Sequence, residues 1–535
     1  MSGGPYRDSG GDQPAEAPRD EGIVGDVIAQ FADIHAFYRE LVQNSIDAGS
    51  PSIEVELDYD RDAQRMNVSV KDRGEGMTRD IVENQLLVLF RSTKEKDKSK
   101  IGKFGIGFAS VLAPNPEVVK VHTVRDKRRL TLHLYRDLSY ELFDAGPATQ
   151  NGTTVTLELA MKPDAVKEFV HASRSALRRW CRHATVPIEF WETRADGRGG
   201  ERIDGPLEIG RTLAEVRETT DAGQLTVVVG IGGMPTVGFY NHGLTLYETS
   251  HDMLLGNIAA KIQDARLGHT ISRDDVRRDE HFDRAVSFAR EVANTKLAAE
   301  AARKLKEYAE AKRVEDVAAL VEAVADAKLE LPAWPMPLVE PVLGATTLDV
   351  SRVHKVWASR HSTPLTEDLA RLGQHVILAK DVERLASHLE RPTGVKIREV
   401  HGELTSIKPV ERSERDEALL GTLLSILDKV YRNPGAIVLA DLVGLHADRF
   451  AISGLEEGAH VVSRDDAAKN PFALLGRRPL VLSIAHPLVQ AARAHDDPRL
   501  AAAHLARAVL LHHRLLDFGR SQEILDLALE QTGLE

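Results

Sequence analysis

The sequence predicts a protein that mixes α-helices and β-strands in more than one domain. Residues 28–37 carry apolar side chains at helical spacing, and residues 66–71 alternate apolar and polar side chains as a half-buried strand does. Residues 101–112 place a glycine-rich loop before a short apolar run that suggests a helix. The chain has 535 residues. Since that length exceeds what one hydrophobic core holds, about two to four domains are expected.

The first helical segment continues into a row of polar side chains, Glu40-Leu-Val-Gln-Asn-Ser-Ile-Asp-Ala-Gly49, and Gly49-Ser50-Pro51 provides its stop. Glu40, Asn44 and Asp47 stand at i, i+4 and i+7, so they share one face of the helix. A carboxylate, an amide and a second carboxylate in a row can coordinate a hard cation and orient a water molecule. The alternative is a solvated polar stripe.

The half-buried strand leads into a second segment, Asp72-Arg-Gly-Glu-Gly-Met77. A carboxylate at a strand end can accept a hydrogen bond from a ligand. The two glycines that follow would let a flat ligand surface lie against the backbone. By itself, this pattern does not displace the alternative of an ordinary turn.

The third segment is the glycine loop Ile101-Gly-Lys-Phe-Gly-Ile-Gly-Phe-Ala-Ser110. Gly102, Gly105 and Gly107 allow close approach of a ligand, and Lys103 supplies positive charge. A glycine loop that leads into a helix N-terminus is an anion site, and the expected anion is a polyphosphate. The order G-x-x-G-x-G is neither a dinucleotide fingerprint nor a P-loop, so a tight turn between packed elements remains the alternative for this segment alone.

Together and in this order, the three segments resemble the GHKL ATPase superfamily. Gly152-Thr-Thr-Val-Thr-Leu-Glu-Leu159 is similar to the superfamily's last nucleotide-contacting strand. Within the superfamily, residues 101–110 look most like the heat-shock protein 90 (HtpG-like) chaperones, and residues 40–48 and 72–78 agree. The resemblance covers about residues 22–330. It implies an α/β (α+β) fold, a Bergerat-type ATP-binding sandwich of mixed sheet and helices, followed by an α/β middle domain and an α-rich C-terminal region.

The resemblance also implies a role for individual residues. Glu40 would be the general base that activates the attacking water, and Asn44 would hold Mg²⁺ on the phosphates of ATP. Asp72 would receive the exocyclic amine of adenine and so select ATP over GTP. The other nucleotide-binding residues would be Asp47, Gly74, Gly76, Met77 and Thr153 around the base and ribose, and Gly102, Lys103, Phe104, Gly105 and Gly107 around the phosphates.

Two features depart from the chaperone pattern. The family usually has glutamine at the position of Lys103, and a lysine there could add a phosphate contact. Residues Thr78 to Lys100 would form a flexible lid over the nucleotide. This lid carries Leu-Phe-Arg-Ser-Thr-Lys94, which is closer to the mismatch-repair MutL and MORC branches.

A downstream segment, Leu267-Gly-His-Thr-Ile-Ser-Arg-Asp-Asp-Val276, resembles the part of the chaperone middle domain whose arginine reaches the γ-phosphate. Arg273 holds that position. A guanidinium from a second domain neutralises charge in the phosphoryl-transfer transition state. Thr270 replaces the family's asparagine and Arg277 its glutamine. The alternative for Arg273 is a helix-capping or surface arginine.

Composition excludes several classes of protein. The single cysteine, Cys181, excludes a disulfide framework and is expected to be a buried apolar residue. The net charge of −12 argues against a dedicated nucleic-acid binder. No apolar run is long enough for a membrane span, and no signal peptide precedes the globular part, so a cytoplasmic location is expected.

Changes in composition along the chain, including its proline-rich segment, predict the domain organisation. The strands of the ATPase sheet would be Ile53–Tyr59, Met66–Asp72, Val118–Val124, Leu130–Tyr135 and Val155–Leu159. The expected domains are a disordered segment over residues 1–22, an ATPase domain over 23–186, a middle domain over 187–330 that ends in helices from His281 to Leu329, a proline-rich linker over 331–341, and an α/β and helical C-terminal region over 342–535.

The expected function is an ATP-dependent molecular chaperone of the heat-shock protein 90 type. Such a protein hydrolyses ATP to ADP and phosphate with Mg²⁺, as a homodimer whose clamp-like closure acts on client proteins. The helical C-terminus could be the dimerisation surface or a self-contained cap. The alternative function is a MORC- or MutL-like ATPase whose clamp closes on DNA. A signalling module of the histidine-kinase type is less favoured, because no phosphoacceptor-histidine helix precedes the ATPase segments.

Overall fold

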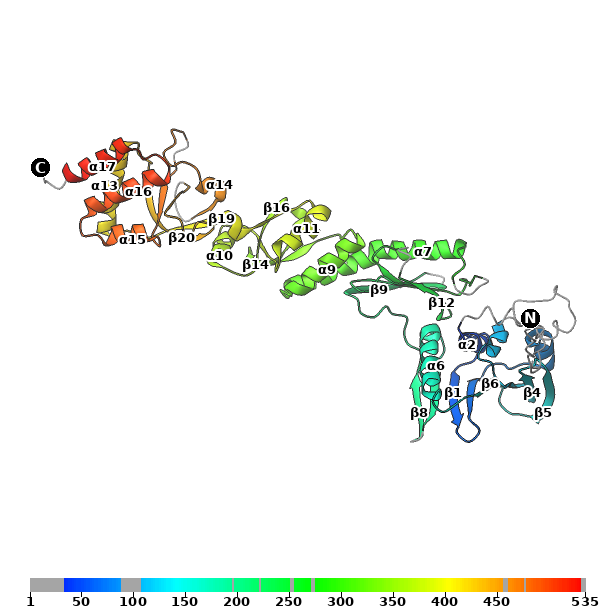
Figure 1. Cartoon of the computed structure of the whole chain (residues 1–535). Coiled ribbons are helices and arrows are strands. Elements are labelled where there is room, and N and C mark those ends of the chain that lie inside the picture. The colour runs from blue at the N-terminus through cyan, green and yellow to red at the C-terminus, as the bar shows by residue number, and fades with distance from the viewer. Residues whose placement is uncertain are drawn as a thin grey trace, which may run out of the picture.

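The computed structural model describes residues 33–87, 107–194, 197–220, 223–250, 255–270, 275–455, 460–475 and 478–530. Within these residues, four β-sheets with their helices follow one another along an elongated molecule. The N-terminal sheet lies at one end and the C-terminal helices lie at the other (Figure 1). The expected α/β class is therefore confirmed. Residues 1–22 lie outside the described part of the chain.

The first sheet has eight strands in the order β5-β4-β3-β6-β2-β1-β7-β8. The alternation that predicted its strands decides which side chains are buried: Val68 and Val70 of β2 are in the core, whereas Lys71 is exposed. The five expected strands are confirmed to within a few residues, and three more strands join them. The bounds are β1 Ile53–Asp60, β2 Arg65–Asp72, β3 Val118–Arg125, β4 Arg128–Tyr135, β5 Tyr140–Pro147, β6 Gly152–Ala160, β7 Ile188–Arg194 and β8 Gly197–Arg202.

Helices cover one face of this sheet. Helix α2 (Phe37–Asp47) and helix α6 (Val166–Cys181) contact each other, and their apolar sides join a core with the inward side chains of the strands. Cys181 ends α6 and is fully buried, which raises the pKa of its thiol to about 12. The shorter helices on this face are α3 (Arg79–Ile81), η1 (Val82–Leu86) and η3 (Ala109–Leu112).

The expected boundary after Val186 falls inside this sheet. Strand β7 starts at Ile188 and runs parallel to β1, with Ile53 opposite Ile188. The backbone N–H of Ile53 also donates to the carbonyl of Pro187 at 2.9 Å. The first domain therefore includes β7 and β8, because burial of Ile188 and Phe190 depends on the N-terminal core.

The second sheet has the order β12-β11-β13-β10-β9 and lies against a run of helices. The expected helical stretch from His281 to Leu329 is confirmed, with a turn at residues 311–313. The strands are β9 Ala214–Thr219, β10 Leu225–Ile231, β11 Val237–Asn241, β12 Leu244–Thr249 and β13 Ala259–Asp264, and the helices are α7 Glu280–Val292, η4 Ala293–Leu297, α8 Ala298–Glu310 and α9 Val314–Ala327.

The proline-rich segment is a buried strand and not the expected linker over residues 331–341. Strand β14 (Pro335–Val342) pairs with β15 (Ala345–Asp349) and β17 (Val376–Leu378), and its residues 335–339 are buried. Pro335 and Pro337 lie two positions apart, so their missing N–H groups face the same side of the strand. The third sheet, in the order β15-β14-β17-β16-β18, is completed by β16 Lys355–Ser359 and β18 Lys396–Glu399.

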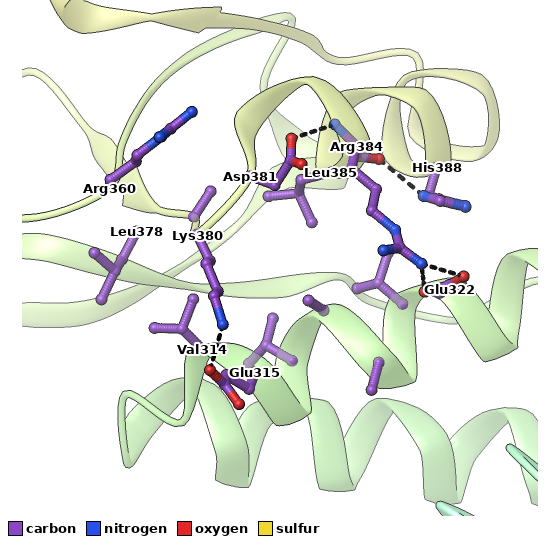
Figure 2. Close-up of a pocket in the computed structure, with 15 residues that line it drawn as sticks. Val314, Glu315, Glu322, Arg360, Leu378, Lys380, Asp381, Arg384, Leu385 and His388 are labelled. Carbon is purple, nitrogen blue, oxygen red and sulfur yellow. Dashed lines mark hydrogen bonds and ion pairs between the residues drawn. The ribbon is translucent and has the colours of Figure 1, made fainter.

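The second and third sheets share one hydrophobic core, and two ion pairs add to the junction. Lys380 Nζ contacts Glu315 at 2.6 Å, and Arg384 Nη2 contacts Glu322 at 2.6 Å. Lys380 lies just before α11 (Val382–Thr393), Arg384 lies in the first turn of α11, and both side chains reach across to α9 (Figure 2). A groove of about 490 Å³ lies between the two helices.

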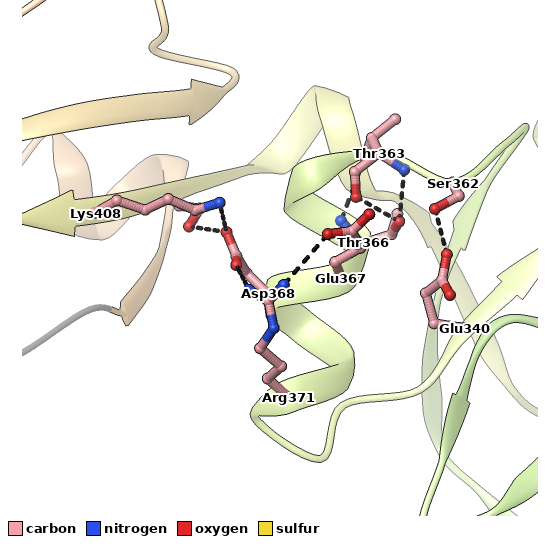
Figure 3. Close-up of polar contacts among 9 residues, drawn as sticks. Glu340, Ser362, Thr363, Thr366, Glu367, Asp368, Arg371 and Lys408 are labelled. Atoms are coloured by element: carbon pink, nitrogen blue, oxygen red, sulfur yellow. Dashed lines mark hydrogen bonds and ion pairs between the residues drawn. The ribbon is translucent and has the colours of Figure 1, made fainter.

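The fourth sheet has the order β21-β23-β20-β19-β22, and Asp368 ties it to helix α10 (Pro364–Arg371) of the preceding unit (Figure 3). Asp368 accepts hydrogen bonds from Ser406 at 2.7 Å and pairs with Lys408 at 3.0 Å. Both partners lie on β19 (Leu404–Pro409).

The other elements of this unit are β20 Ile437–Gly444, β21 Ala451–Ser453, β22 His460–Ser463, β23 Leu480–Ser483, α12 Val400–Glu403, α13 Glu414–Val430, α14 Arg464–Ala467, α15 Pro487–Ala494, α16 Pro498–His512 and α17 Phe518–Glu530. None of the helices in the described part of the chain combines the length and apolar character that a membrane span requires.

Candidate nucleotide site

A cavity of about 230 Å³ lies between helix α2 and the ends of β2 and β6 in the first domain. Apolar side chains form much of its wall, and Asp72, Asn44, Asp47 and Thr153 supply polar groups. A mostly apolar pocket with a few convergent polar groups is typical of a small-molecule site. The other lining residues are Leu41, Ser45, Ala48, Val70, Gly76, Met77, Ile81, Gln85, Leu86, Phe108, Val121 and Val155.

Asp72 is held at the end of β2 by hydrogen bonds from both sides. Its Oδ1 accepts from the backbone N–H of Gly74 at 2.8 Å and of Thr153 at 3.1 Å. Its Oδ2 accepts a longer hydrogen bond from the hydroxyl of Ser45 at 3.4 Å. Burial raises the pKa of this carboxyl, although the hydrogen bonds from Gly74, Thr153 and Ser45 oppose that rise.

Close backbone packing requires the glycines of this segment. Gly76 has φ +73°, and a Cβ there would lie 2.0 Å from the carbonyl oxygen of Val124. A Cβ on Gly74 would lie 2.6 Å from the carbonyl oxygen of Ala48, the residue that follows α2. The D-x-G-x-G pattern thus brings the end of β2 into direct contact with the helix and with β3.

Two residues of this network were not predicted from the sequence, Ser45 and Thr123. The hydroxyl of Thr123 accepts from the backbone N–H of Met77 at 2.8 Å and contacts the hydroxyl of Thr153 at 3.1 Å. The sequence does carry a signal for Thr123. Val119, Val121 and Thr123 occupy alternate, inward positions of β3, so Thr123 is a polar side chain at a position where apolar side chains are expected.

The polar face of α2 contributes three of the predicted residues. Asn44 and Asp47 are exposed and line the cavity. Glu40 lies one turn earlier on the same face, with a side chain that is 12% exposed. Its Oε1 is 3.3 Å from Nη2 of Arg39, whose guanidinium lies over the ring of Trp180 at 4.8 Å. The two carboxylates, Glu40 and Asp47, and the amide of Asn44 therefore lie on the same side of the helix, as the spacing predicted.

Several predicted residues lie outside the described part of the chain. These are Gly102, Lys103, Phe104, Gly105, Arg273 and residues 88–100 of the expected lid. Gly107 is described: its carbonyl accepts a hydrogen bond from the hydroxyl of Ser110 at 2.7 Å, just before the turn of η3. The adjacent Phe108 is buried in the wall of the cavity.

The segments on either side of Arg273 pair with each other. The backbone N–H of Thr270 donates to the carbonyl of Asp275 at 3.0 Å, and that of Arg277 donates to the carbonyl of Gly268 at 2.7 Å. The two described segments therefore lie side by side, and His269 and Val276 form an antiparallel bridge between them.

Comparison with known proteins agrees with this geometry. Residues 35–142 match the family described as histidine kinase-, DNA gyrase B-, and HSP90-like ATPase. A chaperone protein HtpG of Idiomarina loihiensis is 27% identical over 187 residues, covering 31% of this chain and 28% of the relative. HtpG of Methylococcus capsulatus is 26% identical over 219 residues, which is 34% of this chain and 33% of the relative.

HtpG of Shewanella sp. is 30% identical over 211 residues, which is 32% of each chain. The chain thus spans about a third of the length of these relatives. The resemblance to the heat-shock protein 90 chaperones is confirmed over about a third of this chain, and the resemblance to the GHKL ATPase superfamily is confirmed over residues 35–142.

Proposed function

We propose that the chain is an ATP-dependent chaperone of the heat-shock protein 90 type, in which ATP bound at the α2 cavity is slowly hydrolysed to drive a change in shape. The observation that carries the proposal is the placement of Asp72, a partly buried carboxylate held by two backbone N–H groups in a largely apolar cavity. The chaperone names of the relatives support the family, and the activity of the whole chain is our inference.

The hydrogen bonds of Asp72 support its assignment to adenine. Oδ1 is occupied by the N–H groups of Gly74 and Thr153, whereas Oδ2 has the weaker 3.4 Å contact with Ser45. An exocyclic amine would donate to Oδ2. The carbonyl of guanine would instead place a second acceptor there, so the site would select ATP over GTP. Gly76, Met77 and Thr153 would form the wall around the base, and Gly74 would keep this wall close to α2.

Glu40 is proposed as the general base. In this role its carboxylate takes a proton from water as the water attacks the γ-phosphate, and the leaving group is ADP. Arg39 at 3.3 Å would orient the carboxylate. The oxygen donors of Asn44 and its neighbours on α2 suit a hard cation, so the donor set fits Mg²⁺. Mg²⁺, when bound, would neutralise phosphate charge, and Asn44 is the residue proposed to hold it.

The remaining roles are also proposals. Gly102, Lys103, Phe104, Gly105 and Gly107 would bind the phosphates, Asp47 would lie near the ribose, and Arg273 would approach the γ-phosphate from the second domain. The position of Gly107 beside the cavity residue Phe108 supports the first assignment.

Client proteins, a homodimer and a cytoplasmic location complete the proposal. Exposed apolar side chains on the last helices support self-association: Leu511 is 65% exposed and Phe518 is 86% exposed. A clamp that closes on bound protein would couple such a dimer to the nucleotide.

Steady-state ATP turnover tests the proposal. The purified chain is titrated with a permanently unfolded polypeptide and, separately, with duplex DNA. Stimulation by the polypeptide alone supports a chaperone. Stimulation by DNA alone would assign the chain to a MORC- or MutL-like clamp, and no turnover under any condition would refute an ATPase.

A further inference from the structure

The first domain has a second pocket, on the face of the sheet that the helices leave uncovered. It measures about 340 Å³ and is lined by residues from β2, β3, β4, β6 and the turns beside them. Val70, Val121 and Val155 point into the core, so their neighbours Lys71, His122 and Thr154 point to the opposite face. This pocket therefore lies behind the nucleotide cavity and opens separately to solvent.

Strand register brings the lining residues into one row. Lys71 of β2 pairs with Thr154 of β6, Thr154 pairs with His122 of β3, and His122 pairs with Thr131 of β4. Directly opposite residues in antiparallel strands have Cβ atoms about 5 Å apart. The hydroxyl of Thr131 lies 3.0 Å from Nδ1 of His122 and holds the ring in this row.

The next row of paired residues also lines the pocket. Val124 pairs with Gly152 on one side and with Arg129 on the other. Gly152 has φ +143°, and a Cβ there would lie 2.4 Å from the carbonyl oxygen of Asp72. Glycine therefore lets the start of β6 lie against the end of β2, and Arg73 and Arg129 line the pocket beside this contact.

The charge of the pocket is strongly positive. Lys71, Arg73 and Arg129 are exposed, and no carboxylate in the described part of the chain forms an ion pair with any of them. Glu54 lies opposite Lys71 in the register, but its carboxylate is paired with Arg198 at 3.0 Å. Uncompensated cations around a concave surface attract an anion.

Asp72 also lines this pocket, but its carboxylate is engaged by hydrogen-bond donors on the nucleotide side. Neutral hydrogen-bonding groups come from Gln150, Asn151 and Thr154. Two guanidinium groups, one ammonium group and several neutral donors suit a tetrahedral oxyanion better than a single carboxylate.

We propose that this basic pocket binds a phosphate group, either free or carried by a phosphorylated segment of a partner. Arg73 and Arg129 make charge-assisted hydrogen bonds to the phosphate oxygens, and Lys71 adds a third positive charge. The site is separate from the nucleotide cavity, because the sheet lies between the two.

His122 provides a local reporter of binding. The groups that face it are Thr154 of β6, Lys120 of its own strand, and Arg129, Thr131 and His133 of β4. Burial lowers the pKa of His122, and the nearby positive charges of His133, Lys120 and Arg129 lower it further. An anion in the pocket stabilises the imidazolium and raises this pKa, by about 1 for a close opposite charge.

The test uses the full chain labelled at histidine for NMR, without nucleotide. The His122 signal is assigned by its loss in His122→Gln, and its pKa is measured with inorganic phosphate and with a phosphoserine peptide. We expect a rise with at least one probe, and the more effective probe identifies the source of the phosphate. The rise is lost in the double variant Arg73→Glu/Arg129→Glu.

A matched control places the same charge change at Arg61, an exposed residue in the turn between β1 and β2 at the other end of the sheet. Arg61→Glu keeps the rise in the pKa of His122. If the double variant fails to fold, the milder Arg129→Gln replaces it and is expected to weaken binding at least severalfold. An unchanged pKa with both probes, or an equal rise in the double variant, overturns the proposal. ATP is absent throughout, so the result does not depend on the proposed ATPase.

Discussion

Replacing Asp72 with asparagine should separate the proposed binding of ATP from folding. The amide oxygen of Asn can accept the hydrogen bonds that Gly74 and Thr153 now donate to Oδ1 at 2.8 and 3.1 Å. The amide nitrogen would then occupy the position of Oδ2, where the hydroxyl of Ser45 can accept from it. Because burial raises the pKa of Asp72, its charge is disfavoured in the folded protein. The neutral variant is therefore expected to be at least as stable as the native chain.

The same substitution should abolish useful affinity for ATP. The adenine amine would lose a hydrogen bond to a charged acceptor, worth about 1.5–3 kcal/mol, and would meet a second donor that is left unsatisfied at a cost of about 1–3 kcal/mol. Since about 1.4 kcal/mol corresponds to a tenfold change, the dissociation constant should rise by about 10²–10⁴.

The assay is calorimetric titration of ATP into both proteins, with thermal unfolding as the control for folding. Native affinity in the variant would refute the assignment of Asp72 to adenine. A fall in thermal stability would instead refute the account of the buried charge.

The remaining predictions concern catalysis, packing and pH. Glu40→Ala should leave ATP binding intact and slow turnover by about 10²–10⁴-fold, and unchanged turnover would remove Glu40 from the role of base. Gly76→Ala should lower the free energy of unfolding by about 1–3 kcal/mol or more, because a Cβ would lie 2.0 Å from a carbonyl oxygen of β3. Gly49→Ala is the control for this substitution. The φ of Gly49, +70°, is similar, but a Cβ there would have no atom within 4 Å, so chemical denaturation should show that the free energy of unfolding falls by about 1 kcal/mol or less. Arg493→Ala should destabilise the C-terminal unit by about 2–3 kcal/mol, since Asp416 is buried and accepts hydrogen bonds from that guanidinium at 2.7 and 2.9 Å. The guanidinium lowers the pKa of Asp416, so this stabilisation is present above a pH of about 4 and is lost as the pH falls through the folded-state pKa of Asp416. If the native and variant chains lose stability equally in acid, the pairing of Arg493 with Asp416 is contradicted.

Regular side-chain alternation predicted the inner strands of the first sheet, but three strands were missed. Strand β8 has the sequence Gly-Arg-Gly-Gly-Glu-Arg and lies at an edge of the sheet, as does β5 at the other edge. Edge strands bury few apolar side chains, so their sequences carry a weak periodic signal. The residues of β7 fall in the expected middle domain, where no strand is predicted for them, because the parallel partner β1 is far away in the sequence.

Composition was misleading at β14. The four prolines of residues 331–341 are typical of an extended linker, and residues 335–341 are indeed extended. Its burial depends on pairing with β15 and β17 and on the shared core of the second and third sheets, which proline content does not report.

The sequence by itself determined the local placement of the polar residues that we propose to bind and hydrolyse the nucleotide. Helical spacing places Glu40, Asn44 and Asp47 on one face, and a strand end followed by glycines places Asp72 where a ligand can reach it, because these relations depend on local geometry. Only the tertiary structure decided that Ser45 and Thr123 join Asp72, and that a basic pocket lies behind it. Those relations depend on the register between strands that are far apart in the chain, and register is set by packing of the whole core rather than by any one segment.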